Sequence, residues 1–114
     1  MYNTKTRRIF MPIQLTTKNF SDIIFNSNQT VLLTFLSSDK EIAKKQKDIL
    51  RQFALQNPHI LVANIDSEKE PSLVTMYKSS PIQVPSVKVF KNGCCIASTD
   101  GVLSQQELLR FVVE

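Results

Sequence analysis

Few residues of this 114-residue chain have side chains suited to covalent chemistry. Its two cysteines, Cys94 and Cys95, are adjacent, and its single histidine is His59. Adjacent cysteines have neither the spacing of metal ligands nor that of a disulfide framework, and a bridge between neighbours needs a strained turn. No serine or thiol motif accompanies His59, so we expect a residue of a surface loop. The sequence therefore predicts no metal and no cofactor.

Cys94 and Cys95 follow Asn92-Gly93 in a segment with the pattern of a strand. Neighbouring side chains of a strand point to opposite faces, so we expect one thiol to be buried and the other exposed. A free cysteine commonly behaves as a small hydrophobic residue. We therefore favour thiols without a redox role. A mixed disulfide at an exposed Cys94 or Cys95 is the alternative.

Four basic residues recur along one side of a predicted helix, namely Lys40, Lys44, Lys47 and Arg51. This stripe begins at the amino terminus of the helix, where free backbone amides favour anions. It would suit an acidic peptide, a phosphate or a carboxylate. A solvated helix side that serves solubility is the simpler interpretation.

The composition indicates one folded domain, because 42% hydrophobic and 21% charged residues are near globular averages. The apolar runs are far shorter than the roughly 20 residues that cross a bilayer, so we expect no membrane span. Residues 1–10 contain three of the 14 basic residues and no secretory signal. We expect residues 1–10 to form a flexible basic arm and residues 11–114 the domain, with Met1 or Met11 as the start. The net charge of +4 does not require a nucleic-acid partner.

Hydrophobic periodicity predicts five strands and four helices. The strands are expected at residues 13–15, 30–36, 60–66, 86–90 and 94–98, and the helices at 19–25, at 40 to about 56, after Pro71 and after Ser104. The almost continuously apolar segment 30–36 should be the central strand. The long helix that follows it predicts a parallel pair with 60–66, and Asn92-Gly93 predicts an antiparallel hairpin.

Two helix starts carry the spacing of a capping box, in which a serine side chain and a glutamate three residues later satisfy backbone amides. Ser38 with Glu41 predicts the start of the long helix, and Ser104 with Glu107 that of the last helix.

This order of elements, from Ile13 to Val113, resembles the thioredoxin fold. Residues 31–35 (Val-Leu-Leu-Thr-Phe) are similar to the strand that leads to the thioredoxin active site, Val84-Pro85 to its cis-proline loop, and 90–104 to its closing hairpin and last-helix start. The resemblance implies an α/β fold with a single three-layer domain. In it, four helices flank a central mixed sheet of five strands, parallel ones plus a C-terminal antiparallel hairpin.

The resemblance also shows that the family's active-site residues are replaced. Where thioredoxins carry Cys-x-x-Cys at the start of the long helix, this chain has Lys40, Glu41, Ile42 and Ala43. Thr34 stands where the family keeps a buried acidic proton relay. Dithiol exchange needs one sulfur to attack and a second to resolve the mixed disulfide, so it is chemically excluded at this site.

In this fold, the groove beside the cis-proline binds an extended segment by strand addition. The matching positions are Ser38, Asp39, Val84, Pro85 and Gly101. We therefore expect a redox-inactive interaction or scaffold module whose partner is a protein or an extended peptide. Pro85 could instead serve only to bend the chain.

Two other functions remain open. One is a divergent thiol-disulfide oxidoreductase of cell redox homeostasis that uses Cys94 or Cys95, and the other is a structural role in a larger assembly. Without a signal or a disulfide framework, we expect a cytoplasmic protein. The abundance of Asn, Ile, Lys and Ser suggests an AT-rich coding sequence, which makes the plastid stroma the alternative location.

Overall fold

The computed structural model of the chain describes residues 12–76 and 85–113. The strands are β1 (Ile13–Gln14), β2 (Thr30–Leu36), β3 (Ile60–Asp66), β4 (Ser86–Lys91) and β5 (Cys94–Asp100), and the helices are α2 (Phe20–Phe25), α3 (Lys40–Gln56), α4 (Pro71–Met76) and α5 (Gln105–Val113). These described elements confirm the predicted five strands and four helices. The predicted arm at 1–10, the segment 77–83 and Val84 lie outside the described residues, and so does the peptide bond that precedes Pro85.

The sheet has the strand order β1-β3-β2-β4-β5, so β2 is its central strand, as predicted. The pairs β1–β3 and β2–β3 are parallel, whereas β2–β4 and β4–β5 are antiparallel. Every residue of β2 from Val31 to Leu36 is buried, because the sheet is covered on both faces.

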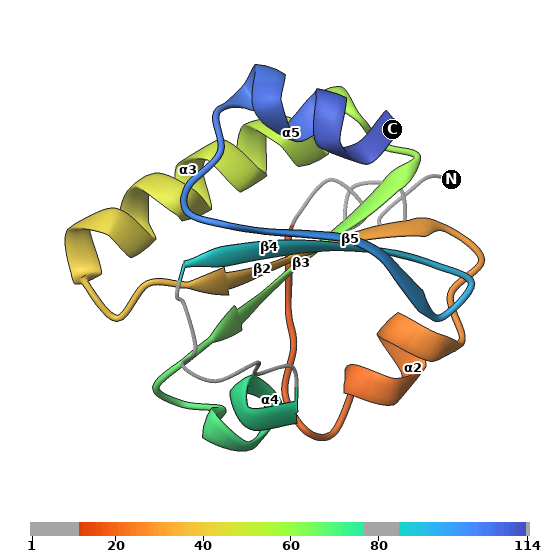
Figure 1. The fold of residues 1–114 in the computed structure, drawn as a ribbon, viewed down its shortest axis with the longest axis horizontal. Helices are drawn as coiled ribbons and strands as arrows, with labels where there is room; N and C mark the ends of the chain where they lie inside the picture. Colours follow the sequence, from red (N-terminus) through yellow and green to blue (C-terminus); the bar gives the residue numbers. More distant parts are fainter. Residues whose placement is uncertain (1–11, 77–84, 114) are drawn as a thin grey trace, which may run out of the picture.

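Two helices cover each face of the sheet: α3 and α5 lie on one side, and α2 and α4 on the other (Figure 1). Alternate residues of the strands therefore enter different cores. Leu32 packs with Phe53 of α3 and Leu108 of α5, whereas Leu33 packs with Ile24 of α2. Within the described residues, no helix is long and apolar enough to cross a bilayer.

The predicted turn between β4 and β5 is confirmed by its backbone angles. Asn92 has a φ of 52° and Gly93 a φ of 81°, as the type I′ turn of a two-residue hairpin requires. The capping box of α5 is also confirmed, since the Glu107 amide donates to Ser104 Oγ and the Ser104 amide donates to Glu107 Oε1.

The prediction of one buried and one exposed thiol is wrong, because Cys94 and Cys95 are both exposed. β5 is an edge strand, and its register with β4 shifts between Val89 and Phe90. On the far side of this shift, Ala97 pairs with Val89 and packs against the core beneath α3 and α5. The hairpin end of β5 contributes no side chain to either described core, so simple alternation does not bury a cysteine there.

The register gathers four segments at one end of the sheet. β2 and β3 are in step from Thr30 opposite Ile60 to Leu36 opposite Asp66, so their carboxyl ends coincide. β4 runs the other way, with Ser86 opposite Phe35, and its first residue therefore lies at the same end. The β4–β5 hairpin lies at the opposite end.

We predict that the core beneath α3 dominates the stability of the domain. Phe53 is 1% exposed, and Phe53→Ala should lower the free energy of unfolding by about 3–5 kcal/mol through lost burial and a residual cavity. Leu55, on the same helix, is 56% exposed, and Leu55→Ala should cost less than about 1 kcal/mol. Urea denaturation followed by circular dichroism measures both, and similar losses would contradict the packing described.

Candidate functional site

The first turn of α3 is capped by Asp39. Its Oδ1 accepts hydrogen bonds from the amides of Glu41 at 2.9 Å and Ile42 at 3.1 Å. The prediction that Ser38 caps this helix is therefore wrong. Asp39 is the residue with extended backbone directly before the helix (φ −74°, ψ 121°), and its charge is favourable at the positive end of the helix dipole. Ser38 lies one residue outside.

This cap changes what the amino terminus of α3 offers to a ligand. The sequence predicts free amides that attract an anion, but two of them already donate to the Asp39 carboxylate. An external anion would have to compete for these amides with the carboxylate of Asp39. Attraction at this site must therefore come from side chains.

The four positions that match the family active site occupy the first turn of α3, as predicted. Lys40, Glu41 and Ile42 are exposed, and Ala43 is half-buried against the core under α3 and α5. None of them has a sulfur or hydroxyl nucleophile. The arrangement offers a charged and apolar surface, with no group that attacks a disulfide.

The predicted groove residues Pro85 and Gly101 are joined by a hydrogen bond, in which the Gly101 amide donates to the Pro85 carbonyl oxygen at 2.7 Å. Gly101 has a φ of 99°, which favours glycine, and a Cβ added there would meet no atom within 4 Å. Backbone conformation, not crowding, explains this glycine. Because Ser86 pairs with Phe35, the register places Pro85 beside the end of β2, from which the chain continues to Ser38.

A buried polar layer lies beneath this end of the sheet. Thr34 is 2% exposed, and its hydroxyl oxygen has no hydrogen-bond partner among the described residues. The side chain of Gln46, 3% exposed, accepts a hydrogen bond from the Ser37 amide at 2.8 Å and so ties the loop after β2 to α3. Because a threonine hydroxyl does not titrate near neutral pH, Thr34 supplies no acid at the proton-relay position.

Gln46 was not singled out in the sequence, although a signal was present. Its spacing to Leu50 and Phe53 puts it on the buried side of α3, where an uncharged polar residue needs a hydrogen-bond partner.

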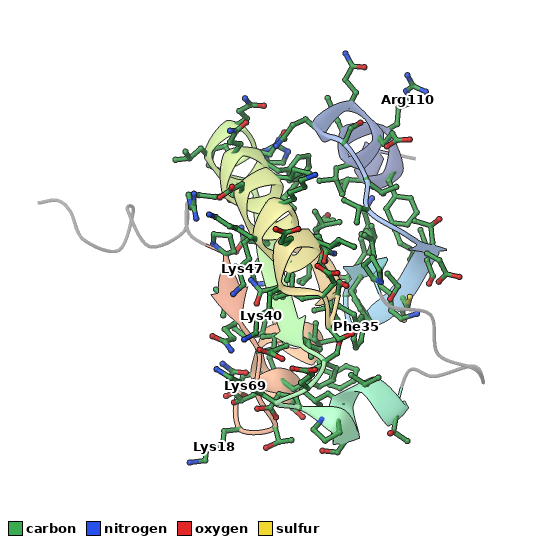
Figure 2. All side chains as sticks on the ribbon, turned by 90° about the vertical axis from the view of Figure 1, so that its left-hand side faces the viewer. Lys18, Phe35, Lys40, Lys47, Lys69 and Arg110 are labelled. Carbon is green, nitrogen blue, oxygen red and sulfur yellow. The ribbon has the colours of Figure 1, made fainter. Side chains whose placement is uncertain are left out.

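Three members of the basic stripe come together with a residue that sequence reasoning missed. Lys40, Lys44 and Lys47 line a hollow of about 370 Å³, and Lys69 reaches it from the loop between β3 and α4. Figure 2 shows Lys40, Lys47 and Lys69 on one side of the molecule. Arg51, which was predicted in the same stripe, instead pairs with Asp48 at 3.1 Å.

Cys94 and Cys95 lie away from these residues. Cys95 pairs with Phe90, which pairs with Val31 at the amino end of β2, whereas α3 follows its carboxyl end. The length of β2 separates the two places by roughly 16 Å, at about 3.3 Å per residue. Cys95 Sγ donates to the carbonyl oxygen of Ala97 at 3.5 Å. Within 12–76 and 85–113, no three potential metal ligands gather. His59 is an exposed turn residue, which confirms its predicted surface position.

The cap of α3 gives a direct prediction. Asp39→Ala should lower the free energy of unfolding by about 1 kcal/mol, because two amides of the first turn lose their acceptor. Ser38→Ala is the matched control and should change it by less than about 0.5 kcal/mol. Thermal and urea denaturation measure both. A larger loss for Ser38→Ala would restore serine as the cap.

Comparison with known proteins places these features in a family context. Residues 11–114 match the Thioredoxin family. Thioredoxin C-3 of Corynebacterium nephridii is 30% identical over 101 residues, which cover 89% of this chain and 68% of that protein. Thioredoxin of Buchnera aphidicola subsp. Acyrthosiphon pisum is 26% identical over 103 residues, which cover 90% and 94%. A mutant thioredoxin from Halobacterium salinarum NRC-1 shares the fold, with a TM-score of 0.77 at 19% identity over 90% of this chain and 88% of the other.

Proposed function

Because this chain belongs to the thioredoxin family but lacks both active-site cysteines, we propose that it is a redox-inactive member that binds an extended protein segment beside Pro85. One observation carries the proposal: Lys40 and Ala43 occupy the first turn of α3 where the family has its two thiols. The reaction needs a thiolate that attacks and a second sulfur that resolves the mixed disulfide. Neither the ammonium group of lysine nor the methyl group of alanine has a free electron pair with which to attack a disulfide.

The surroundings of that turn agree with the absence of thiol chemistry. A helix terminus stabilises a thiolate through its backbone amides, and here Asp39 already accepts from two of them. The buried layer below holds the hydroxyl of Thr34, which does not ionise near neutral pH and cannot act as the acid of a proton relay. The two thiols that the reaction requires are absent, and two features that would assist them, free amides and a buried acid, are absent at the same place.

Binding, by contrast, needs only a suitable surface. Two exposed apolar side chains at this end of the sheet could contact a bound segment. Ile42 is 38% exposed in the first turn of α3, and Val102, 42% exposed, follows Gly101. Apolar contacts of this kind supply affinity for side chains of an extended segment, while the backbone near Pro85 supplies direction. The proposed partner is a protein or an extended peptide, with the cytoplasm as the proposed location and the plastid stroma as the alternative.

The second candidate is a thiol-disulfide oxidoreductase that uses Cys94 or Cys95. It is favoured by the exposure of both thiols and by the relatives' names, which are those of thioredoxins. It is disfavoured by the distance to the groove and by the strain of a bridge between adjacent strand residues. This candidate requires that disulfide reduction disappear in Cys94→Ser/Cys95→Ser.

We predict that a selected peptide binds beside Pro85 without the cysteines. Peptides enriched from a displayed random library should bind the parent and Cys94→Ser/Cys95→Ser equally. Pro85→Ala releases the fixed φ of proline and should displace the neighbouring backbone, which weakens that binding about ten-fold, the worth of one or two backbone hydrogen bonds. Pro58→Ala, an exposed proline in the turn after α3, is the matched control and should have no effect.

Isothermal titration calorimetry gives the affinities, and circular dichroism confirms that each variant is folded. Should Pro85→Ala prove unstable, Ile42→Ser changes the same surface at an exposed position. Undiminished binding by both variants would overturn the groove and favour a structural role within a larger assembly.

A further inference from the structure

The hollow beside α3 shares only Ser38 with the positions assigned to the groove at Pro85. Its walls are the loop after β2, the first two turns of α3 and the loop between β3 and α4. β3 and β4 flank β2 on opposite sides, so this hollow and the Pro85 groove lie on opposite sides of the α3 start. The proposed binding of an extended segment does not use this hollow.

Positive charge dominates the lining of the hollow. The residues are Ser37, Ser38, Lys40, Ala43, Lys44, Lys47, Asp66, Glu68 and Lys69, so four lysines stand against two carboxylates. Four lysine side chains that line one space repel one another and attract anions into it. A solvated helix side explains lysines along α3 alone, but not a fourth lysine that lines the same space from another loop.

None of these lysines forms an ion pair within the described ranges. The one ion pair there joins Asp48 to Arg51, on a different part of α3. Asp66 Oδ1 accepts from the amides of Glu68 and Lys69 at 3.0 and 3.2 Å. Asp66 and Glu68 together offset two of the four lysine charges, so the lining keeps a net positive charge. The carboxylate of Asp66 shapes the loop that carries Lys69.

Hydrogen bonds hold the walls in place before any ligand arrives. Ser67 Oγ donates to the carbonyl oxygen of Leu36 at 2.7 Å and joins the loop after β3 to the end of β2. Gln46 fixes the backbone of Ser37 from below. The hydroxyl of Ser37 accepts from the Asp39 amide, which leaves its own proton available to a ligand. An anion that binds here would therefore order only lysine side chains and not the backbone, which limits the entropic cost of binding.

We propose that this hollow binds a phosphoryl group, as free phosphate or as a phosphate ester. A phosphate carries about two negative charges at neutral pH and several acceptor oxygens, so it can engage more than two of the lysines and a serine hydroxyl together. A single carboxylate carries half that charge. Lysine serves such a ligand as a flexible point charge, and this suits four side chains that approach from two elements.

The test is a titration of the ¹⁵N-labelled full chain with inorganic phosphate, followed by two-dimensional NMR at constant ionic strength, because salt screens these charges. Amide shifts should saturate in the millimolar range and fall on residues 37–47 and 66–69. Acetate at the same concentration should produce much smaller shifts. Shifts that do not saturate, or that match those with acetate, would overturn the proposal.

Two neighbouring lysines of α3 provide the matched variants. Lys44 lines the hollow and Lys45 does not, although both are exposed. Lys44→Gln should weaken phosphate binding about five-fold, the effect of removing one nearby charge, and Lys44→Arg should retain it. Lys45→Gln should leave it unchanged. Equal losses for Lys44→Gln and Lys45→Gln would reduce the effect to overall charge and contradict a site.

A second pair of ligands distinguishes a phosphorylated protein from free phosphate or a small ester as the source of the phosphoryl group. A phosphoserine peptide that binds more tightly than inorganic phosphate, when its unphosphorylated form does not bind, identifies a phosphorylated protein. Equal affinity for the phosphopeptide and phosphate identifies a free phosphate or a small ester. Pro85→Ala should leave phosphate binding intact, so this inference and the proposed groove can fail separately.

Discussion

The pairing of β2 with β3 on one side and β4 on the other is the constraint on which the rest of the structure depends. β2 is buried on both faces, and a slip of one residue would exchange the side chains that enter the two cores. The parallel register brings the carboxyl ends of β2 and β3 together, and the antiparallel register adds Pro85 to the same end. Both proposed surfaces exist because this register is fixed.

The start of α3 lies between those two surfaces and is occupied by its own cap. In a dithiol enzyme of this fold, the same amides would stabilise a thiolate. Here Asp39 accepts from two of them and neutralises part of the helix dipole. We propose that this place, which supports nucleophilic chemistry in the family, serves here as a structural terminus. In this proposal, recognition falls to the apolar side chains on the Pro85 side and the lysines on the β3 side.

Sequence reasoning succeeded where one local signal agrees with the tertiary structure. The apolar run 30–36 became the central strand, and Asn92-Gly93 formed the hairpin turn because both residues accept positive φ. It failed where the outcome depends on the backbone conformation of adjacent residues. Ser38 and Asp39 are both good caps, and only the residue with extended backbone directly before the helix takes the role.

The site was only partly predictable, because some of its residues are brought together by contacts between distant segments. Its α3 residues follow from helical spacing, but Lys69 joins them only because the parallel register brings the β3–α4 loop beside α3. The exposure of both cysteines depends on the edge position of β5 and on the register shift at Val89 and Phe90. Helical spacing to Leu50 and Phe53 indicates that Gln46 is buried, but its hydrogen-bond partner, the Ser37 amide, is known only from the structure. Contacts between distant segments leave no local pattern.

The most direct measurement is the rate of disulfide reduction in an insulin assay with dithiothreitol. It compares the parent, Cys94→Ser/Cys95→Ser and Lys40→Cys/Ala43→Cys, beside a thioredoxin with its Cys-x-x-Cys motif. We expect the parent and the double serine variant to remain at the reductant background, while the double cysteine variant rises above it. Cysteine-dependent reduction by the parent, lost in the double serine variant, would show that the protein is redox-active and place the chemistry in the β4–β5 hairpin.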